Sequence, residues 1–173
     1  MGRGKINETV IGYKIYNEAN ELLGTAEVEL PNVTFMTEEI SGAGINGKLE
    51  SVIMGYIETM STTINWRTME PNAVELSAPE FHQIIIKSAV QKTDLSNLKT
   101  TISQHKYILA VKPKTFNTGK ITSGATSDVN IEFSVSYYKV YIDGVKQIEI
   151  DPINYICEIN GRDYLKEVRE ALD

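Results

Sequence analysis

The stretch "VNIEFSVSYYKVYIDGVKQIEI", Val129 to Ile150, gives the clearest indication of the fold. Its first half alternates apolar and polar residues, the pattern of a strand that buries one face. The apolar positions are Ile131, Phe133, Val135 and Tyr137. Asp143-Gly144 follows, a two-residue turn that suits the twist of paired strands. We therefore expect an antiparallel hairpin here.

Strand signals continue on both sides of this hairpin. Residues 9–16, 22–40, 49–66 and 98–116 are rich in β-branched and aromatic residues, which favour strands. Pro31 cannot donate to a strand ladder, so we expect a bulge or an edge position around it. Residues 153–159 predict a last strand, with Ile153, Tyr155, Cys157 and Ile159 on one face.

Two segments predict helices. Residues 77–89, "SAPEFHQIIIKSA", offer Ser77 as the N-cap, Glu80 three residues later and a proline in the first turn. Residues 162–173 predict a C-terminal helix that buries Leu165, Val168 and Leu172. The predicted fold is mainly antiparallel β, a sandwich or barrel-like arrangement with one short internal helix and a C-terminal helix. We expect one domain over residues 1–173.

The segment "SGAGING" has the Gly42-x-Gly44-x-x-Gly47 spacing of a dinucleotide-binding fingerprint. That fingerprint requires a helix after its last glycine, where the helix N-terminus holds the pyrophosphate. Residues 49–66 are instead rich in β-branched residues and predict strand. We therefore interpret the glycines as a loop between two strands and expect no cofactor.

No arrangement of residues predicts catalysis or metal binding. His82 and His105 lack the spacing of a metal site, and Cys157, the single cysteine, is expected to be a small buried apolar residue. We predict that the protein is not an enzyme.

Charge is distributed unevenly along the chain, whose formal net charge is −6. From Glu8 to Glu58, nine carboxylates face two lysines; from Glu80 to Lys120, seven lysines face two acids. These are either two solvated faces or two surfaces that meet between copies of the protein. Our candidates for such a contact are Glu38, Glu39, Lys112 and Lys114. The negative net charge argues against a protein that grips nucleic acid through many phosphate contacts.

Membrane association is not expected. No stretch approaches the roughly 20 apolar residues of a membrane span. The first twelve residues lack the apolar core of a secretory signal.

Two segments resemble the major tail tube protein family of contractile-tailed phages and phage-tail-like bacteriocins. "ISGAGINGKL", residues 40–49, is similar to the family's R-G-A-G-x-N-G stretch, with Ser41 where the family often has arginine. Residues 137–172 carry the Asp-Gly hairpin, "EIDPIN", a strand ending at Asn160-Gly161 and a short charged helix. The order of elements is also similar.

The resemblance implies a structural protein of the virion tail, assembled in the host cytoplasm. Its subunits would form hexameric rings, stacked into a tube inside a contractile sheath. DNA would pass through the lumen without specific binding, as would the tape-measure protein. The other implied partners are the sheath, tail terminator and baseplate proteins. The loop that would contact an adjacent ring comprises Gly42, Ala43, Gly44, Ile45, Asn46, Gly47 and Lys48.

Two other classes stay open at this point. A β-rich tail or baseplate adaptor would form discrete oligomers, and an enzyme with a cofactor loop at residues 42–47 would be stabilised by its ligand. A lumen lined with carboxylates would repel phosphates and allow DNA to slide.

Overall fold

The computed structural model describes residues 4–19, 21, 23 and 26–173 of the chain. The strands are β1 (Lys5–Tyr16), β2 (Ala26–Glu29), β3 (Phe35–Ser41), β4 (Lys48–Ile57), β5 (Met60–Trp66), β6 (His82–Asp94), β7 (Lys99–Asn117), β8 (Val129–Ile142), β9 (Val145–Asp151), β10 (Ile156–Ile159) and β11 (Arg162–Asp163). The helices are α1 (Pro71–Leu76) and α2 (Lys166–Leu172). This mainly antiparallel β architecture with two short helices agrees with the fold class that the sequence predicts.

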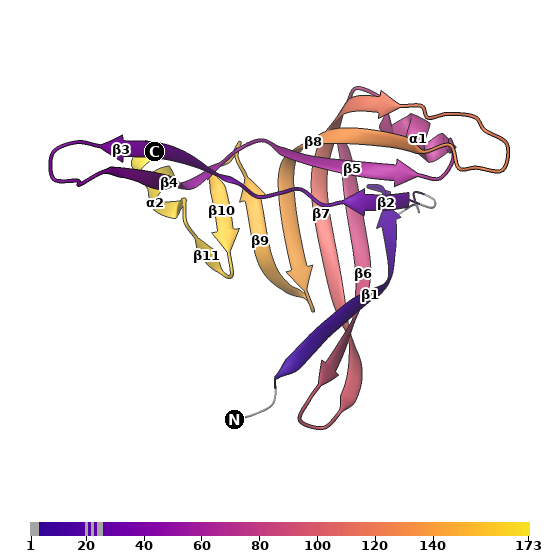
Figure 1. Ribbon diagram of the computed structural model, residues 1–173, viewed down its shortest axis with the longest axis horizontal. Coiled ribbons are helices and arrows are strands. Elements are labelled where there is room, and N and C mark those ends of the chain that lie inside the picture. Colours follow the sequence, from indigo (N-terminus) through magenta and orange to yellow (C-terminus); the bar gives the residue numbers. More distant parts are fainter. Residues whose placement is uncertain (1–3, 20, 22, 24–25) are drawn as a thin grey trace.

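A large antiparallel sheet forms the body of the molecule, in the order β1-β6-β7-β8-β9-β10-β11. A ribbon of β2 and β5 joins this sheet through the pairing of β5 with β8. The ribbon runs across the ends of the long strands and continues into a separate hairpin, β3–β4 (Figure 1).

Strand β8 belongs to both layers of the molecule. On one edge it pairs with β7; on the other it pairs first with β5, from Val129 to Val135, and then with β9, from Tyr138 to Ile142. A bulge between these two halves shifts the register opposite Ala110 and Val111. Because of this shift Tyr138 is buried and Tyr137 is only half-buried, so the uninterrupted alternation predicted through Tyr137 is wrong at its last position.

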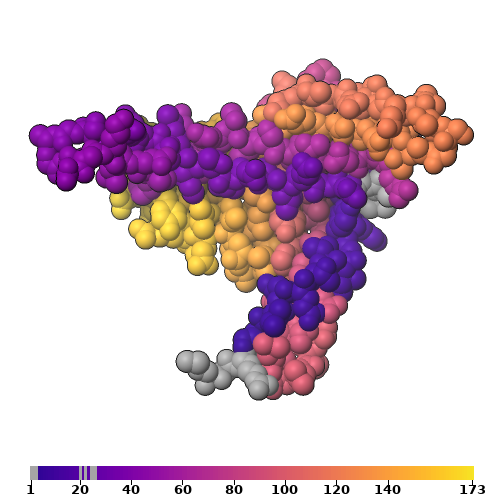
Figure 2. All heavy atoms as spheres, in the orientation of Figure 1, coloured from indigo at the N-terminus to yellow at the C-terminus, as the bar shows by residue number. Residues whose placement is uncertain are grey.

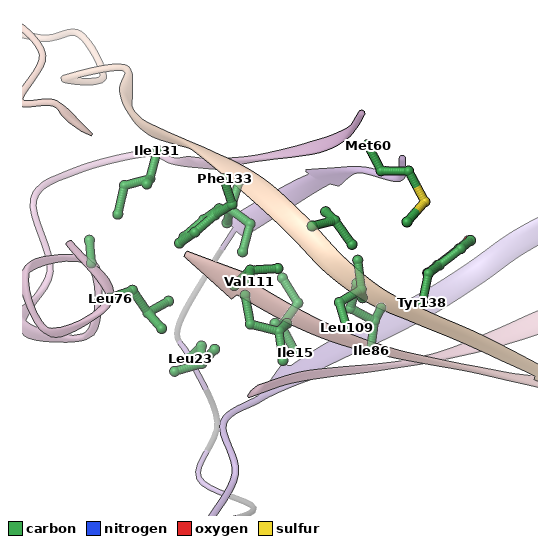
Figure 3. Packing of buried hydrophobic residues seen from close by; sticks show 14 of the residues in the cluster. Ile15, Leu23, Met60, Leu76, Ile86, Leu109, Val111, Ile131, Phe133 and Tyr138 are labelled. Carbon is green, nitrogen blue, oxygen red and sulfur yellow. The ribbon is translucent and has the colours of Figure 1, made fainter. Parts of the chain in front are cut away.

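The core lies between the two layers and is filled mainly from β8. Ile131 and Phe133 are completely buried, and they pack with Val111 of β7 and Leu76 of α1 in one cluster (Figure 3). Trp66 of β5 is also buried, and its indole N–H donates to the carbonyl of Leu23 at 3.2 Å.

The internal helix lies earlier than predicted. Ser77 is the C-cap of α1 and not the N-cap of a following helix. Most of the predicted helix is strand β6, where Ile84 and Ile86 point into the core at a period of two. Three consecutive isoleucines, residues 84–86, are poor helix formers and pack well on a sheet. Helix α1 is only six residues long and lacks a side-chain cap, so no capping signal marked it.

The predicted strand over residues 153–159 is shorter in the structure, and β10 begins only at Ile156. The Asp151 carboxylate accepts hydrogen bonds from the N–H groups of Ile153 and Asn154 and turns the chain there. Ile153 and Tyr155 are therefore exposed, whereas Cys157 is buried as predicted. Helix α2 is also shorter than predicted, and it leaves Leu172 exposed.

The Phe133→Ala substitution tests the central role of β8 in the core. Removing a completely buried ring costs about 3–5 kcal/mol. Phe81→Ala is the matched control, because the Phe81 side chain is 65% exposed. We expect a loss under about 1 kcal/mol there, by chemical denaturation. Equal losses at the two positions would contradict this description of the core.

Candidate assembly surfaces

The hairpin β3–β4 forms an arm, residues 35–57, that projects beyond β10 and α2 (Figures 1 and 2). Its two strands pair only with each other, as a separate two-stranded sheet, within the described residues. An isolated two-stranded hairpin is at best marginally stable in water. The arm is therefore a segment that neighbouring molecules would stabilise.

Apolar side chains lie on both faces of this arm. Ile40 is opposite Leu49 on one face, and Val52 is opposite Thr37 on the other. The exposed apolar residues of the arm are Met36, Ile40, Ile45, Leu49, Val52, Met54 and Tyr56. Exposed apolar groups on both faces are typical of a surface that contacts other proteins.

The glycine-rich segment forms the tip of the arm. Gly44 and Gly47 have φ of 91° and 115°, and the N–H of Ile45 donates to the carbonyl of Gly42 at 3.1 Å. A strand follows, beginning at Lys48, so no helix N-terminus is present to hold a phosphate. The prediction of a loop between two strands is confirmed.

The base of the arm is held by the C-terminal segment. Gly55 has φ of 73°, and a Cβ atom at this position would lie 2.5 Å from Leu165 Cδ2. The N–H of Glu58 donates to the carbonyl of Thr34 at 2.8 Å and closes the hairpin base. The direction of the arm thus depends on a close contact with the residue that precedes α2.

An ion pair holds this C-terminal support in place. The Arg169 guanidinium donates to the Asp163 carboxylate and to the carbonyl of Tyr155. The hydrogen bond from Arg169 lowers the pKa of Asp163, and the N–H of Leu165 contributes in the same direction. The same contacts fasten β11, α2 and the turn before β10 to one another.

The edges of the large sheet are a second assembly surface. Strand β1 pairs with β6 on one edge only, within the described residues. Four apolar residues of β1 are exposed, namely Ile6, Val10, Ile11 and Tyr13. The opposite end of the sheet is formed by the short strands β10 and β11. Open edges of this kind tend to pair with another chain.

The proposed charge candidates lie on separate elements, and the structure does not bring them together within the chain. Glu38 and Glu39 lie on the arm, where Glu39 pairs with Lys48 at 3.0 Å. Lys114 of β7 pairs with Glu132 at 2.9 Å. The Lys112 Nζ lies 5.5 Å from the centre of the Phe81 ring.

Comparison with known proteins identifies the family. The profile of the family described as "Phage tail tube protein FII" matches residues 7–172. The chain belongs to this phage tail tube family. It is 27% identical over 151 residues to the "Tail tube protein" of Escherichia phage P2. This alignment covers 84% of each of the two chains.

A solved structure supports the same fold. The chain is similar, with a TM-score of 0.55 and 11% identity, to a chain from the cryo-EM structure of the PVC sheath/tube terminator of an extracellular contractile injection system in the extended state. The match covers 79% of this chain and 97% of the terminator chain. At this identity the likeness concerns the fold alone.

Family membership confirms the resemblance drawn from residues 40–49 and 137–172, and it confirms a structural protein and not an enzyme. Among the described residues, no group of three or more histidines, cysteines or acids could hold a metal ion. Neither helix in the described part of this tail tube protein is long and apolar enough to cross a membrane.

Sequence reasoning located the tip of the arm but missed its apolar sides and the exposed β1 edge. The sequence of β4, "KLESVIMGYI", could have suggested the apolar sides of the arm, because it has apolar residues in both phases. A strand with two apolar phases is one that becomes buried on both faces.

The Gly55→Ala substitution tests the support of the arm in this tail tube protein. Gly144 is the matched control, because it has φ of 78° and open space around it. Left-handed backbone costs a non-glycine residue about 1–2 kcal/mol at either position. We expect Gly55→Ala to lose more unfolding free energy than Gly144→Ala, because it adds the collision with Leu165. Equal losses in denaturation experiments would mean that the contact is unimportant.

Acid should weaken the C-terminal support through Asp163. Its pKa is lowered in the folded state, so its contribution is complete above the unfolded pKa and is lost as the pH falls through the folded value. We expect wild type to exceed Asp163→Asn in unfolding free energy at neutral pH, with the difference shrinking below about pH 4. Exposed Glu167, changed to glutamine, serves as the control. A pH-independent difference for Asp163→Asn would exclude this linkage.

Proposed function

We propose that this protein forms the inner tube of a contractile phage tail or of a bacteriocin-like particle. Six subunits make a ring, and rings stack into a hollow tube through which DNA and the tape-measure protein pass. Residues 1–173 constitute the tail tube domain. The observation that carries this proposal is the arm, a hairpin with apolar side chains on both faces.

Ring formation is supported by the two open ends of the large sheet. Strand β1 lies at one end and β10–β11 at the other. Pairing the ends of neighbouring subunits closes the sheet into a barrel and removes the exposed edges. A head-to-tail contact of this kind generates a ring when its rotation closes.

Stacking is supported by the length and exposure of the arm. The arm extends past the sheet in the direction of β10 and α2, where it can reach another subunit (Figure 2). We propose that the tip, Gly42 to Lys48, contacts a subunit of the adjacent ring. Backbone at the three glycines can approach another chain closely, because these residues carry no side chain.

Charge complementarity would contribute to these contacts. Glu38 and Glu39 of one subunit are candidates to face lysines of another subunit. Lys114 already has a carboxylate partner in Glu132, so Lys112 is the better candidate of the two. The sheath, terminator and baseplate proteins are the further proposed partners, and assembly takes place in the host cytoplasm.

A discrete adaptor is the alternative function. The fold is compatible with it, because a chain from the structure of a sheath/tube terminator has a similar fold. Negative-stain electron microscopy of the purified protein over a range of concentrations separates the two. Long hollow tubes support the tube function, and closed oligomers of one size at every concentration support the adaptor.

The double substitution Leu49→Ser/Val52→Ser tests the arm itself. Each side chain is more than half exposed in the subunit, so we expect the unfolding free energy to change by about 0.5 kcal/mol or less. Tube formation should fall strongly, because both apolar faces of the arm lose their contact groups. Val145→Ser is the control, because Val145 is 61% exposed at the start of β9. Tubes of normal yield in the arm variant, counted in micrographs, would rule out the arm as the assembly element.

A further inference from the structure

Two asparagines of the chain stand directly before a glycine, in the pairs Asn46–Gly47 and Asn160–Gly161. An asparagine side chain reacts most readily with the main chain when glycine follows, because glycine has no side chain to obstruct the approach of its own nitrogen. The two pairs lie in different surroundings. The β3–β4 loop, at the left in Figure 1, contains Asn46, whereas the β10–β11 turn contains Asn160.

The reaction is an intramolecular displacement that requires only a base and water. The backbone nitrogen of the glycine loses its proton to the base and attacks the asparagine Cγ. A bond forms between this nitrogen and Cγ, the bond from Cγ to Nδ2 breaks, and ammonia leaves with a proton returned by the base. Water then opens the cyclic imide. Opening at Cγ gives aspartate, and opening at the main-chain carbonyl carbon gives isoaspartate, in which the main chain runs through the side chain.

Closure of the imide ring depends on rotation of the main chain, because the glycine nitrogen must turn about the asparagine Cα–C bond to reach Cγ. Exposure does not separate the two sites. Both asparagines are exposed, and a Cβ atom built on Gly47 or Gly161 would meet no atom within 4 Å. The freedom of the main chain at each asparagine therefore decides which of them reacts.

Asn160 lies in a two-residue hairpin turn that fixes its main chain. The φ angles of Asn160 and Gly161 are 52° and 81°, both left-handed, as in a type I′ turn. This conformation turns the glycine nitrogen away from the asparagine Cβ. Ile159 pairs with Arg162 across the turn, and the N–H of Asn160 donates to the carbonyl of Gln147 at 2.7 Å. Rotation toward the reactive geometry would break these contacts.

Far fewer contacts hold the main chain at Asn46. Among the described residues, the segment 42–47 makes one backbone hydrogen bond, and neither Asn46 nor Gly47 takes part in it. Strand pairing begins only at Ser41 and Lys48. The arm that carries this loop is a two-stranded sheet of its own, outside the large sheet. A segment with so few contacts samples other main-chain conformations readily.

We propose that Asn46 is a site of spontaneous deamidation, converted to aspartate and isoaspartate in the free subunit, whereas the turn protects Asn160. The new carboxyl group is ionised at neutral pH. The arm carries Glu38, Glu39 and Glu50 against Lys48, so its formal charge changes from −2 to −3. Isoaspartate also adds a carbon atom to the main chain. Both changes alter the charge and the shape of the arm at its tip.

Assembly stops the reaction at Asn46, a consequence that rests on the proposed tube function. A neighbouring subunit that covers the tip restricts the main chain there, because binding orders the segment that it contacts. Deamidation of Asn46 is therefore confined to subunits that remain unassembled. Asn160 reacts slowly in both states, because its turn belongs to the subunit itself.

Timed incubation of the purified full chain in mildly alkaline buffer provides the test. Subunits are kept at a concentration at which size-exclusion chromatography detects no assembly, and a synthetic peptide of residues 40–49 is the unstructured reference. Peptide mass spectrometry follows the conversion at each asparagine, and isoaspartate methyltransferase detects the isoaspartate. We expect Asn46 to react at nearly the rate of the peptide. Asn160 should react at least about tenfold more slowly, because its ordered main chain raises the barrier.

Equal rates at Asn46 and Asn160 in the folded subunit would overturn the proposal, as would an unreacted Asn46 after the peptide has been converted. Circular dichroism during the incubation confirms that the subunit stays folded. In the control N46Q, conversion at this position should be lost, because glutamine would have to close a larger and less favourable ring.

Protection by assembly is measured in the same way on pelleted tubes. Conversion of Asn46 in tubes as fast as in free subunits would overturn the protection and the contact at the tip. Failure of the tube function itself would be visible separately, as an absence of tubes in the wild type. The comparison of Asn46 with Asn160 in free subunits does not depend on tubes, so it tests the deamidation site alone.

Discussion

The hydrogen bonding of β8 on both edges is the constraint on which the rest of the structure depends. One edge is occupied by β7 along nearly its whole length, and the other is shared between β5 and β9. This sharing joins the β2–β5 ribbon to the long sheet, and the bulge opposite Ala110 and Val111 allows the strand to change layer. With β8 so placed, Phe133 faces both β5 and β7 from the centre of the core. The position of the arm follows from this, because the arm continues the β2–β5 ribbon, which β8 holds across the sheet.

Some apolar residues of this protein are buried within the subunit, and others are exposed on its surface. The core around β8 is completely buried, whereas the arm and β1 keep many apolar side chains in water. Those residues contribute little to the free energy of the isolated subunit, and they become stabilising only when a neighbour covers them. In the proposed tube, the contacts between subunits would come from the same strands that would otherwise be an aggregation hazard. The close contact of Gly55 with Leu165 matters for this reason, since it supports the direction in which the arm reaches its neighbour.

Local sequence patterns predicted most strands and turns correctly. They did not predict features that depend on how distant strands pair. The Asp143-Gly144 hairpin, the strand character of residues 49–66 and the turn-forming role of the glycines all follow from composition and spacing over a few residues. The predicted helix over residues 77–89 failed because Ser77 ends a helix instead of starting one, and because the isoleucines at 84–86 pack on a sheet as readily as on a helix. These residues form strand β6 because they pair with β1 and β7, and such pairing between distant segments cannot be read from local sequence. Tyr137 was misplaced because a bulge shifts the phase. The proximity of Lys14, Lys87 and Lys106 could not be predicted, since these lysines become neighbours only through the register of three strands.

Like charges that face each other on paired strands are neutralised at some places in this subunit and not at others. Where carboxylates face each other on β9 and β10, Lys146 bridges them, and on the arm Lys48 pairs with Glu39. Lys14, Lys87 and Lys106 lie opposite one another on β1, β6 and β7. Aromatic rings lie beside Lys87 and Lys106, and these attract cations without removing their charge. An aromatic neighbour keeps a lysine ordered and still available, whereas a carboxylate would have neutralised it. The lysines opposite one another on β1, β6 and β7 therefore keep their charge, at a small cost to the stability of the sheet.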